Sequence, residues 1–265
     1  KTLRGKKGSI VKIGIVRPGV DQQRGRVVKR DVIHNNTITA PYMIDKKTGY
    51  IKIDQFGNTT ASEFEVALLK LKAQGMQKLI LDLRGNAGGY LTSAITICDH
   101  LLADKETILS VEGRNTQKEV IQATKAGLFQ TGDVVVLIDE FSASASEIVA
   151  GAVQDNDRGW VVGRRSFGKG LVQQHTEFDD GSSLRLTVSR YHTPSRRCIQ
   201  RDYHSGTDAY YEDLVQRYEN GEMDSVNNIK FADSLKFYTK KGRVVYGGGG
   251  IMPDHFVGLD KRSYS

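Results

Sequence analysis

The sequence predicts an α/β fold, built from a mostly parallel β-sheet whose strands are connected by helices. Strand-like and helix-like stretches alternate from residue 50 to about residue 165, which is the order of β-turn-α units. Residues 133–139 are nearly all apolar, a pattern typical of a strand buried on both faces of a sheet. Two loops rich in glycine or serine directly follow such strands, where open α/β sheets form their binding sites.

The first two elements of this region are a strand and a helix. Residues 50–54, Tyr-Ile-Lys-Ile-Asp, alternate between apolar and polar side chains as a half-buried strand does. Residues 60–63, Thr-Ala-Ser-Glu, match a capping box, in which a threonine and a later glutamate satisfy the free amides of a helix start. The apolar spacing then predicts a helix from Phe64 to Ala73, which stops at Gly75.

Three further strands and two further helices continue the alternation. The pattern predicts strands over 78–83 and 133–139 and another that starts at Val161, with helices over about 91–102 and 144–154. Crossovers between neighbouring parallel strands are right-handed in almost all proteins, so we expect right-handed crossovers here. Because the strands share one direction, the loops that follow them are expected to meet at one edge of the sheet.

The segments outside this region are less regular. Residues 9–17 alternate as a strand after a basic turn, and the polar stretch 18–25 predicts a linker. Residues 200–240 are rich in tyrosine and acidic residues, with weak helical spacing over 210–218, and predict a surface insertion between two sheet elements. The glycines at 247–250 predict a flexible turn back into the core.

Length and composition set broad limits on the class of protein. A chain of 265 residues forms one large domain or two ordinary ones, and 38% hydrophobic with 26% charged residues is typical of globular proteins. No apolar stretch approaches the ~18–20 residues of a membrane span, so stable membrane insertion is not expected. The start, Lys1 to Lys7, has charge but no apolar signal-peptide core, so we expect a trimmed chain whose export signal lay upstream.

The charge and the cysteines exclude two further classes of function. The net charge of +7 invites a nucleic-acid partner, but lysines and arginines are spread along the chain without interleaved aromatic residues, so none is predicted. Cys98 and Cys198 lie a hundred residues apart, which matches neither a metal pattern nor a disulfide framework. The six histidines lack metal-ligand spacing. We expect no metal site and no cofactor.

Ser144 and Lys169 are the candidate reactive pair. Ser144 lies between an apolar strand and a helix, and a hydroxyl there becomes a nucleophile when a base removes its proton. A lysine serves as that base when burial disfavours its charged form, and small uncharged residues flank Lys169. Spacing alone does not choose among Ser142, Ser144 and Ser146, since a serine also caps helices. Lys169 alone equally fits a solvated surface lysine.

The motifs around these residues resemble one family, the carboxyl-terminal processing (tail-specific) proteases. The serine motif reads Phe-Ser-Ala-Ser-Ala-Ser-Glu-Ile over 141–148, and Phe-Gly-Lys-Gly over 167–170 places the lysine twenty-five positions after Ser144. Two more family motifs are Asp-Leu-Arg-Gly-Asn-Ala-Gly-Gly over 82–89 and Gly-Gly-Ile-Met-Pro-Asp over 249–254. The resemblance covers roughly residues 29 to 257.

The resemblance implies roles for individual residues. It implies Ser144 as nucleophile, Lys169 as general base and Gln173, four residues later, as the group that orients the lysine. Asp155 lies where an acid assists in some members, although a surface acid at a helix end explains it equally well. Gln173 alone equally fits a strand surface.

The tetrahedral oxyanion of acyl transfer needs hydrogen-bond donors of its own. Gly88 and Gly89 allow close backbone approach to a substrate carbonyl, and the Ala145 amide, beside the nucleophile, is the natural second donor. A Gly-Gly pair alone is most often a turn. Ala87 stands where the family often has proline, which loosens that loop without removing a donor.

The resemblance also implies an architecture and a function. The expected fold is a crotonase/ClpP-like spiral of β-β-α units, with residues 1–20 as the remnant strand of a PDZ domain plus linker and 21–265 as the catalytic domain. The expected activity is that of a serine endopeptidase that cuts proteins or peptides with exposed carboxyl termini, outside the cytoplasm in a bacterial periplasm or cell envelope, or a plastid lumen. Homo-oligomerisation is left open. The alternative is a non-catalytic module on the same fold that binds peptides or a hydrophobic ligand. Labelling of Ser144 by a serine-reactive probe distinguishes the protease from this binding module.

Overall fold

A computed structural model describes residues 3–32, 36–114, 116–203 and 206–260 of the chain. Its backbone divides into two compact units, Lys1–Asn36 and Thr37–Ser265, each of which is described by itself below. The second unit holds every residue that the sequence motifs single out.

The first unit is an antiparallel hairpin of two strands, β1 (Ile10–Arg17) and β2 (Val20–Lys29). The polar stretch 18–25, predicted to be a linker, therefore turns back and pairs, with Gly14 opposite Gly25. Pairing satisfies backbone groups that a linker would leave to water. A hairpin alone buries little, and Val16 and Val27 remain 74% and 66% exposed.

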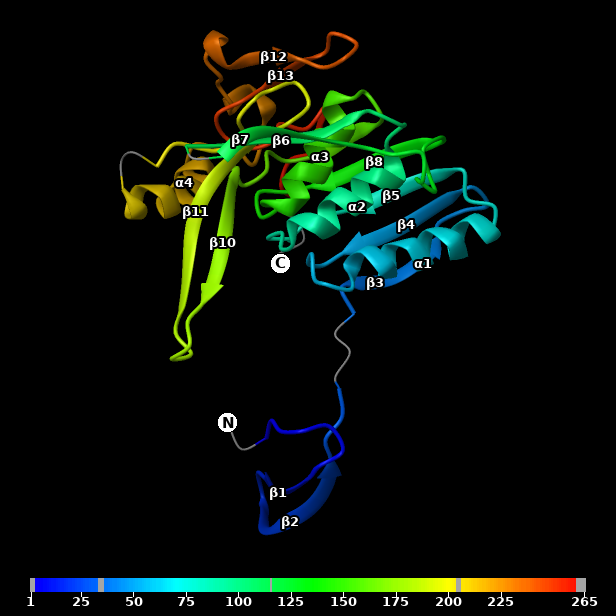
Figure 1. The fold of residues 1–265 in the computed structure, drawn as a ribbon, viewed down its shortest axis with the longest axis vertical. Helices are drawn as coiled ribbons and strands as arrows, with labels where there is room; N and C mark the ends of the chain where they lie inside the picture. Colours follow the sequence, from blue (N-terminus) through cyan, green and yellow to red (C-terminus); the bar gives the residue numbers. More distant parts are fainter. Residues whose placement is uncertain (1–2, 33–35, 115, 204–205, 261–265) are drawn as a thin grey trace. The chain divides into compact units, whose positions relative to one another are not determined.

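A six-stranded sheet forms the centre of the second unit (Figure 1), in the order β14-β9-β8-β5-β4-β3. Its strands are β3 (Ile38–Met43), β4 (Thr48–Ile53), β5 (Lys78–Asp82), β8 (Asp133–Ile138), β9 (Trp160–Gly163) and β14 (His255–Phe256). All neighbours pair in parallel except β3, which is antiparallel to β4. The predicted α/β fold with a mostly parallel sheet is confirmed.

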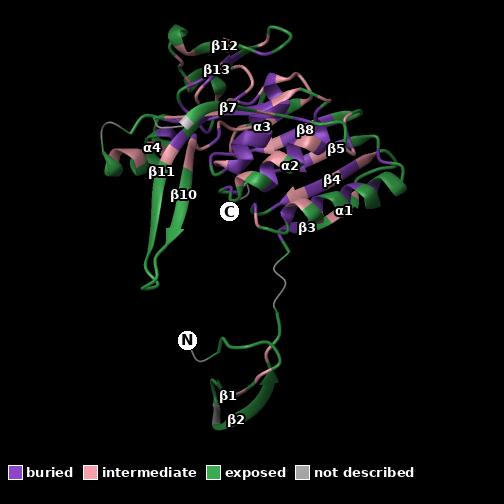
Figure 2. Cartoon of the chain, viewed as in Figure 1, coloured by how far each residue is buried: buried purple, intermediate pink, exposed green. Residues whose placement is uncertain are grey.

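Three helices pack on one face of this sheet: α1 (Thr60–Ala73), α2 (Leu91–Leu101) and α3 (Ala145–Asp155). The order β4, β5, β8, β9 advances in a single direction across the sheet, so crossovers of one hand leave every connecting helix on the same side. Figure 2 shows the result as buried residues concentrated in these helices and in the strands behind them.

Burial alternates along the central strand β8, which differs from the sequence expectation. Val134, Val136 and Ile138 are buried against the helices, whereas Val135 and Leu137 are only half-buried on the opposite face. The expectation of burial on both faces was wrong here, because the helices cover one face only. A continuous apolar sequence is typical of a strand covered on both faces, but here the strand has that sequence while helices cover only one face.

The start of α1 also differs from the expected capping box. The Glu63 carboxylate hydrogen-bonds the side chain of Thr59, the residue before the helix, and it also accepts hydrogen bonds from the amides of Thr37 (2.8 Å) and Ile38 (3.1 Å). The Thr60 hydroxyl accepts from the Gly57 amide at 2.7 Å. The same residue types therefore tie the helix to the beginning of β3, a tertiary contact that local sequence cannot reveal.

A second sheet of four antiparallel strands has the order β10-β11-β6-β7. Its strands are β6 (Thr107–Gly113), β7 (Thr116–Gln122), β10 (Leu171–Glu177) and β11 (Ser183–His192). The strands β10 and β11 form a long hairpin, and most of its side chains are exposed (Figure 2). The strand β10 begins two residues after Lys169, so this sheet continues directly from the lysine loop.

The predicted insertion over 200–240 contains the helix α4 (Thr207–Glu219) and two short 3-10 turns, Val226–Asn228 and Asp233–Leu235. The segment ends with β12 (Lys236–Tyr238), which forms a small hairpin with β13 (Val244–Tyr246). Among the described residues, no helix has the length and apolar character needed to cross a membrane, and no cluster of potential metal ligands is found.

Candidate active site

Two loops at the carboxyl ends of β5 and β8 are joined by hydrogen bonds. Asn86, in the glycine-rich loop after β5, accepts at its carbonyl oxygen from the Ala143 amide (3.0 Å) and from the Ser146 hydroxyl (2.9 Å). Asp139, at the end of β8, accepts from the Gly85 amide at 2.9 Å. The parallel strands bring both loops to one edge of the sheet, and these bonds fix them against each other.

The three serines of the serine motif have different environments. The Ser142 hydroxyl is fully buried and donates to the carbonyl oxygen of Leu83 at 2.8 Å. The Ser146 hydroxyl is fully buried and donates to the Asn86 carbonyl oxygen. Ser144 is only half-buried, immediately before α3. The two flanking hydroxyls thus hold the loop together, which leaves Ser144 as the serine of this motif that is open to solvent.

The backbone of Ser144 has an unusual conformation. Its φ is 54° and its ψ −111°, outside the regions that L-residues ordinarily occupy. Such strain persists only where surrounding structure enforces it, and it clusters at functional sites. A strained strand-to-helix turn presents a side chain outward, and here it places that side chain at the positive end of the α3 dipole.

A single buried carboxylate, that of Glu147, joins the serine loop to the lysine loop. Its Oε2 accepts from the amides of Ser144 and Lys169, both at 2.8 Å. Its Oε1 accepts from the Gly168 amide (2.7 Å) and the Ser166 hydroxyl (2.6 Å). Burial raises the pKa of this carboxyl, and the four hydrogen bonds oppose that effect. One side chain therefore sets the position of Ser144 relative to Lys169.

A second buried side chain, that of Tyr191 in β11, bridges the same two residues. Its hydroxyl lies 2.8 Å from the carbonyl oxygen of Lys169 and 3.1 Å from that of Ser144. Tyr191 is 1% exposed, and burial raises its pKa well above the usual value, so it remains a neutral donor. Glu147 receives the amides of the two residues, and Tyr191 donates toward their carbonyls.

The glycine-rich loop lies against Ser144. A side chain at Gly88 would bring its Cβ within 2.6 Å of the Ala143 carbonyl oxygen and 2.8 Å of the Ser144 Cβ, so only glycine fits. The Gly88 amide donates to the Asn86 side chain at 2.8 Å. The amides of Gly89 and Ala145 have no hydrogen-bond acceptor among the described residues. Of the three expected oxyanion donors, two amides are thus free and one is used within the loop.

The strand end before this loop carries a compact charged cluster. Asp82 is fully buried and accepts from Arg84 through Nε (2.9 Å) and Nη2 (2.6 Å), and from the Tyr50 hydroxyl at 2.6 Å. Burial alone would raise the pKa of Asp82, but the hydrogen bonds from Arg84 and Tyr50 outweigh it and lower that pKa. Tyr50, correspondingly, has its pKa raised to about 12 by burial and by Asp82.

A cavity of about 1010 Å³ opens next to Ala143, the residue before Ser144, and Ser144 is not among its lining residues. The loops after β5, β8 and β9, the strands β10 and β11 and the segment around α4 all contribute to it. Its lining residues are Gly85, Ala87, Phe141, Ala143, Phe167, Lys169, Leu171, Gln173, Thr187, Gln200, Tyr203, Gly206, Thr207, Tyr210 and Tyr211. Lys169 and Gln173, predicted from the sequence, thus share one cavity with Ala143, the neighbour of Ser144.

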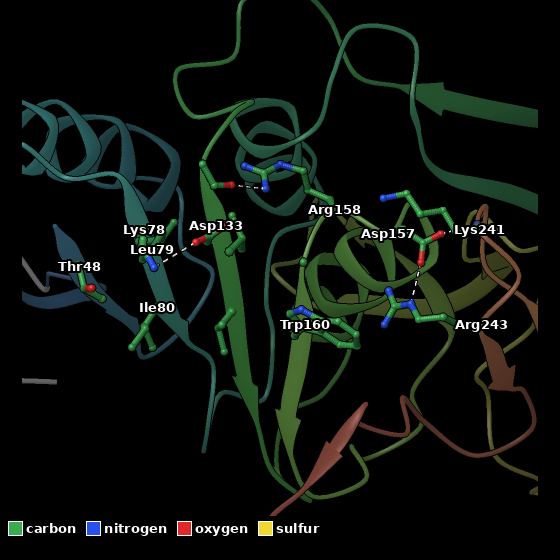
Figure 3. Close-up of a pocket in the computed structure, with 14 residues that line it drawn as sticks. Thr48, Lys78, Leu79, Ile80, Asp133, Asp157, Arg158, Trp160, Lys241 and Arg243 are labelled. Atoms are coloured by element: carbon green, nitrogen blue, oxygen red, sulfur yellow. Dashed lines mark hydrogen bonds and ion pairs between the residues drawn. The ribbon is translucent and has the colours of Figure 1, made fainter.

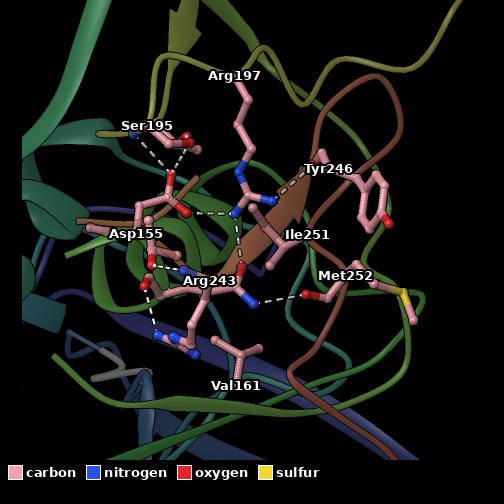
Figure 4. A network of polar contacts seen from close by, with 12 residues as sticks. Asp155, Val161, Ser195, Arg197, Arg243, Tyr246, Ile251 and Met252 are labelled. Atoms are coloured by element: carbon pink, nitrogen blue, oxygen red, sulfur yellow. Dashed lines mark hydrogen bonds and ion pairs between the residues drawn. The ribbon is translucent and has the colours of Figure 1, made fainter. Parts of the chain in front are cut away.

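Asp155 is not brought to this cavity. It ends α3, at the opposite end from Ser144, and forms a fully buried ion pair with Arg197 at 2.8 Å. The Ser195 amide (3.1 Å) and hydroxyl (2.7 Å) donate to its other oxygen (Figure 4). Arg197 also donates to the carbonyl oxygen of Tyr246 at 2.8 Å. The contacts of Asp155 bind the end of α3 to the 195–197 loop and to β13.

The carboxyl-terminal motif, residues 249–254, is hydrogen-bonded to the segment that precedes Lys169. The Ser166 hydroxyl accepts from the Ile251 amide at 2.6 Å, and the Ser166 amide donates to the Ile251 carbonyl oxygen at 3.0 Å. Asp254 accepts from the Val161 amide at 2.8 Å and pairs with Arg243 at 2.5 Å. This motif therefore acts on the site through β9 and Ser166 and does not line the cavity.

Another cavity, of about 700 Å³, lies at the amino ends of the parallel strands (Figure 3), the edge opposite to the serine loop. Among its charged side chains, Lys78 pairs with Asp133 at 3.4 Å, and Arg243 pairs with Asp157 at 2.6 Å. Arg158 donates to three backbone carbonyl oxygens. None of the site residues predicted from the sequence lines this cavity.

Sequence reasoning missed three residues that shape the site: Glu147, Tyr191 and Asn86. Glu147 was detectable in the sequence, because Ser144 and Glu147 stand in capping-box spacing and Glu147 lies within the quoted serine motif. Asn86 lies within the quoted glycine-rich motif, but its side chain was given no role. Tyr191 has no local pattern, since its contacts with Ser144 and Lys169 cross from another sheet.

The chain is similar in sequence to one peptidase family and to several of its curated members. The model of the peptidase family S41 matches residues 47–209. The "Carboxyl-terminal-processing protease" of Picosynechococcus sp. is 39% identical over 201 residues, which cover 75% of this chain and 48% of that protein. The "Carboxy-terminal processing protease CtpA" of Bacillus subtilis (strain 168) is 36% identical over 248 residues, covering 88% and 51%. The chain spans about half the length of these relatives.

Solved structures show similar folds. The photosystem II D1 C-terminal processing protease has a TM-score of 0.56 and 29% sequence identity, and the match covers 74% of this chain and 54% of that one. A lipoprotein from Streptococcus agalactiae has a TM-score of 0.52 at 15% identity, covering 83% and 65%, which indicates a shared fold alone.

Proposed function

Because the chain belongs to peptidase family S41, we propose that it carries the catalytic region of a serine endopeptidase that cleaves proteins near their carboxyl termini. The observation that carries this proposal is the coupling of Ser144 to Lys169 through one buried carboxylate, beside a cavity that Lys169 lines. The names of the relatives support the class of reaction and of substrate.

The proposed mechanism uses Ser144 and Lys169 as a dyad. The Lys169 amine takes the proton of the Ser144 hydroxyl while Oγ attacks the substrate carbonyl carbon, which forms a tetrahedral intermediate. As that intermediate collapses, the C–N bond breaks, and the leaving amine takes the proton from the Lys169 ammonium. A water then attacks the acyl-enzyme with Lys169 again as base, which releases the new carboxyl terminus and restores the serine. Gln173, on the same cavity wall, orients the lysine.

The oxyanion donors are assigned to the amides of Ala145 and Gly89. Ala145 directly follows Ser144, and Gly89 belongs to the glycine-rich loop that lies against Ser144. Neither amide donates to another described residue. Gly88 contributes through its missing side chain, which lets the loop approach Ser144, while its own amide stabilises Asn86. Removing one such donor typically costs about 10²–10³ in rate.

The finer features of the family expectation are part of the same proposal. The β1–β2 hairpin is taken as the remnant of a PDZ domain, and the main sheet with its one-sided helices as a crotonase/ClpP-like spiral. The substrates are proteins or peptides with exposed carboxyl termini, and the location is outside the cytoplasm. The names of the relatives support carboxyl-terminal processing, and the other assignments rest on the family resemblance of the sequence motifs.

Two substitutions test the dyad. Ser144→Ala is expected to abolish peptide hydrolysis and labelling by a fluorophosphonate probe, whereas Ser146→Ala loses about 1 kcal/mol of stability with its hydrogen bond and keeps most of the turnover. Lys169→Arg is expected to be as inactive as Lys169→Ala at neutral and alkaline pH, because a guanidinium stays protonated and cannot accept the proton.

These variants also decide against the alternative. A chain that binds peptides but shows no Ser144-dependent labelling or hydrolysis is a non-catalytic binding module, and that outcome would overturn the proposed function. Activity that survives Ser144→Ala, or that Lys169→Arg restores, contradicts the dyad.

A further inference from the structure

One wall of the cavity that Lys169 lines comes from the inserted segment. Tyr203, Gly206, Thr207, Tyr210 and Tyr211 line it, and Tyr210 and Tyr211 belong to the first turn of α4. The match to the family model ends at residue 209, so both tyrosines lie beyond it. The insertion, expected only to cover the surface, therefore contributes directly to the candidate active site.

Polar contacts, and not an apolar core, hold α4 in place. Arg217 is the only buried residue among the helix's described residues. It donates to the carbonyl oxygens of Ser166 (3.1 Å) and Arg165 (2.6 Å) and pairs with Glu222 at 2.8 Å. These carbonyls belong to the segment that leads into Lys169. The helix is thereby attached to the lysine loop itself.

A second arginine fixes the aromatic end of α4. Arg201 pairs with Asp213 of the helix at 2.5 Å, and its guanidinium lies 3.9 Å from the Phe167 ring centre and 4.0 Å from the Tyr210 ring centre. Phe167 is two residues before Lys169. Cation–π contact on both rings orders Tyr210 against the lysine loop. Tyr211 then packs edge-on to Tyr210 at 5.6 Å, with 67% of its own surface exposed.

The lining has the chemistry of a site for an apolar side chain. Its aromatic rings are Phe141, Phe167, Tyr203, Tyr210 and Tyr211, joined by Leu171. Among the described lining residues, Lys169 is the only lysine, arginine, aspartate or glutamate. A charged substrate side chain would lose hydration in such surroundings without gaining an ion pair, apart from contact with the lysine that the reaction uses.

We propose that Tyr210 and Tyr211 of α4 determine the size of the substrate side chain accepted next to the scissile bond. The inference rests on the proposed function. Tyr210, braced by Arg201, sets the position of the wall, and Tyr211 sets how far the wall extends into the opening. The substrate class is a polypeptide with an apolar residue at the cleavage position.

The test uses Tyr211, because its exposure makes it dispensable for folding. We compare wild type, Tyr211→Ala and Tyr211→Trp on peptides that carry Ala, Leu or Phe on either side of the scissile bond. Tyr211→Ala enlarges the site and is expected to raise the ratio of kcat/KM for Phe over Ala by about tenfold or more. Tyr211→Trp is expected to lower the same ratio. Tyr218→Ala, on the same helix and 58% exposed, is the matched control with an unchanged ratio.

The outcomes separate this inference from the proposed function. Fluorophosphonate labelling of Ser144 reports the reaction centre independently of the peptide series. If labelling and hydrolysis depend on Ser144 but neither Tyr211 variant changes the Phe/Ala ratio, or Tyr218→Ala changes it equally, the specificity role is overturned. If no Ser144-dependent hydrolysis exists in wild type, the proposed function fails, and this inference fails with it.

Discussion

Glu147 shows how much a single buried side chain can determine in a candidate active site. Its two oxygens accept hydrogen bonds from Ser144 and from the 166–169 segment, so a carboxylate that touches no substrate positions both members of the proposed dyad. Displacement of a reacting group by about 1 Å can cost about 10² in rate. The site is therefore sensitive to Glu147 although the residue is a positioning residue.

Glu147→Gln is expected to lower kcat by about 10² or more while KM changes little. The amide keeps the shape of the side chain but turns an NH₂ group toward donors. The 166–169 segment then loses an acceptor in either orientation, and Ser144 also loses its acceptor when the NH₂ group replaces Oε2. Steady-state kinetics on a peptide substrate, together with a thermal melt, measure both effects.

Glu140→Gln is the matched control for this prediction. Glu140 is also nearly buried, and its carboxylate pairs with Arg164 at 2.6 Å and accepts no hydrogen bond from Ser144 or the described lysine loop. We expect reduced stability with kcat close to wild type. Equal losses of kcat in the two variants would show that Glu147 acts through overall stability alone.

At the level of elements, the helix α3 connects two regions with different tasks. Its first residues carry the strained turn and Glu147, and its last residue, Asp155, is locked to the 195–197 loop (Figure 4). Arg197 is fully buried, and removing one partner of a buried ion pair leaves an uncompensated charge. The far end of α3 therefore stabilises the fold around the site.

Asp155→Asn is expected to cost about 3–5 kcal/mol of unfolding free energy through the loss of the buried pair with Arg197. The turnover of the remaining folded protein is expected to stay within about threefold of wild type, because Asp155 and Ser144 lie at opposite ends of the helix. Urea unfolding gives the first quantity, and active-site titration with a fluorophosphonate normalises the second. A large loss of kcat per titrated site, with stability intact, would instead give Asp155 the supporting catalytic role.

At the scale of the whole molecule, stability is distributed unevenly. The main sheet and α1 to α3 share one core of fully buried residues, whereas the first unit is a two-stranded hairpin with exposed valines. Local opening requires less free energy where few apolar contacts are broken. The core and the hairpin are therefore expected to open independently.

Native-state hydrogen exchange on the intact chain tests this expectation. Amides of β5 and β8 are expected to exchange only through global unfolding, and those of β1 and β2 at least about 10³-fold faster, because an isolated hairpin is marginally stable in water. Urea should accelerate exchange in β5 and β8 with a steep slope and leave the hairpin slope near zero. Comparable protection in both units would contradict the view that the hairpin lacks a core.

The sequence by itself determined the alternation of β4, α1, β5, α2, β8, α3 and β9, the parallel sheet and the meeting of the glycine-rich and serine loops, whereas β6 and β7 between α2 and β8 were not predicted. These features depend on local periodicity and on the shared direction of parallel strands, so neighbouring residues carry the information. The motif spacing also indicated Ser144 and Lys169, and the family assignment is confirmed by the comparisons.

Only the tertiary structure decided which side chains complete the site. The hydrogen bonds of Ser142 and Ser146 distinguish these serines from Ser144. The Glu63 carboxylate accepts a hydrogen bond from the residue before β3 and does not form the expected capping box. Residues of α4 form part of the cavity wall. The tertiary structure also showed β8 covered on one face only. The physical reason is common to these cases: burial and hydrogen-bond partners come from segments distant in sequence, and the patterns of one segment do not encode its partners.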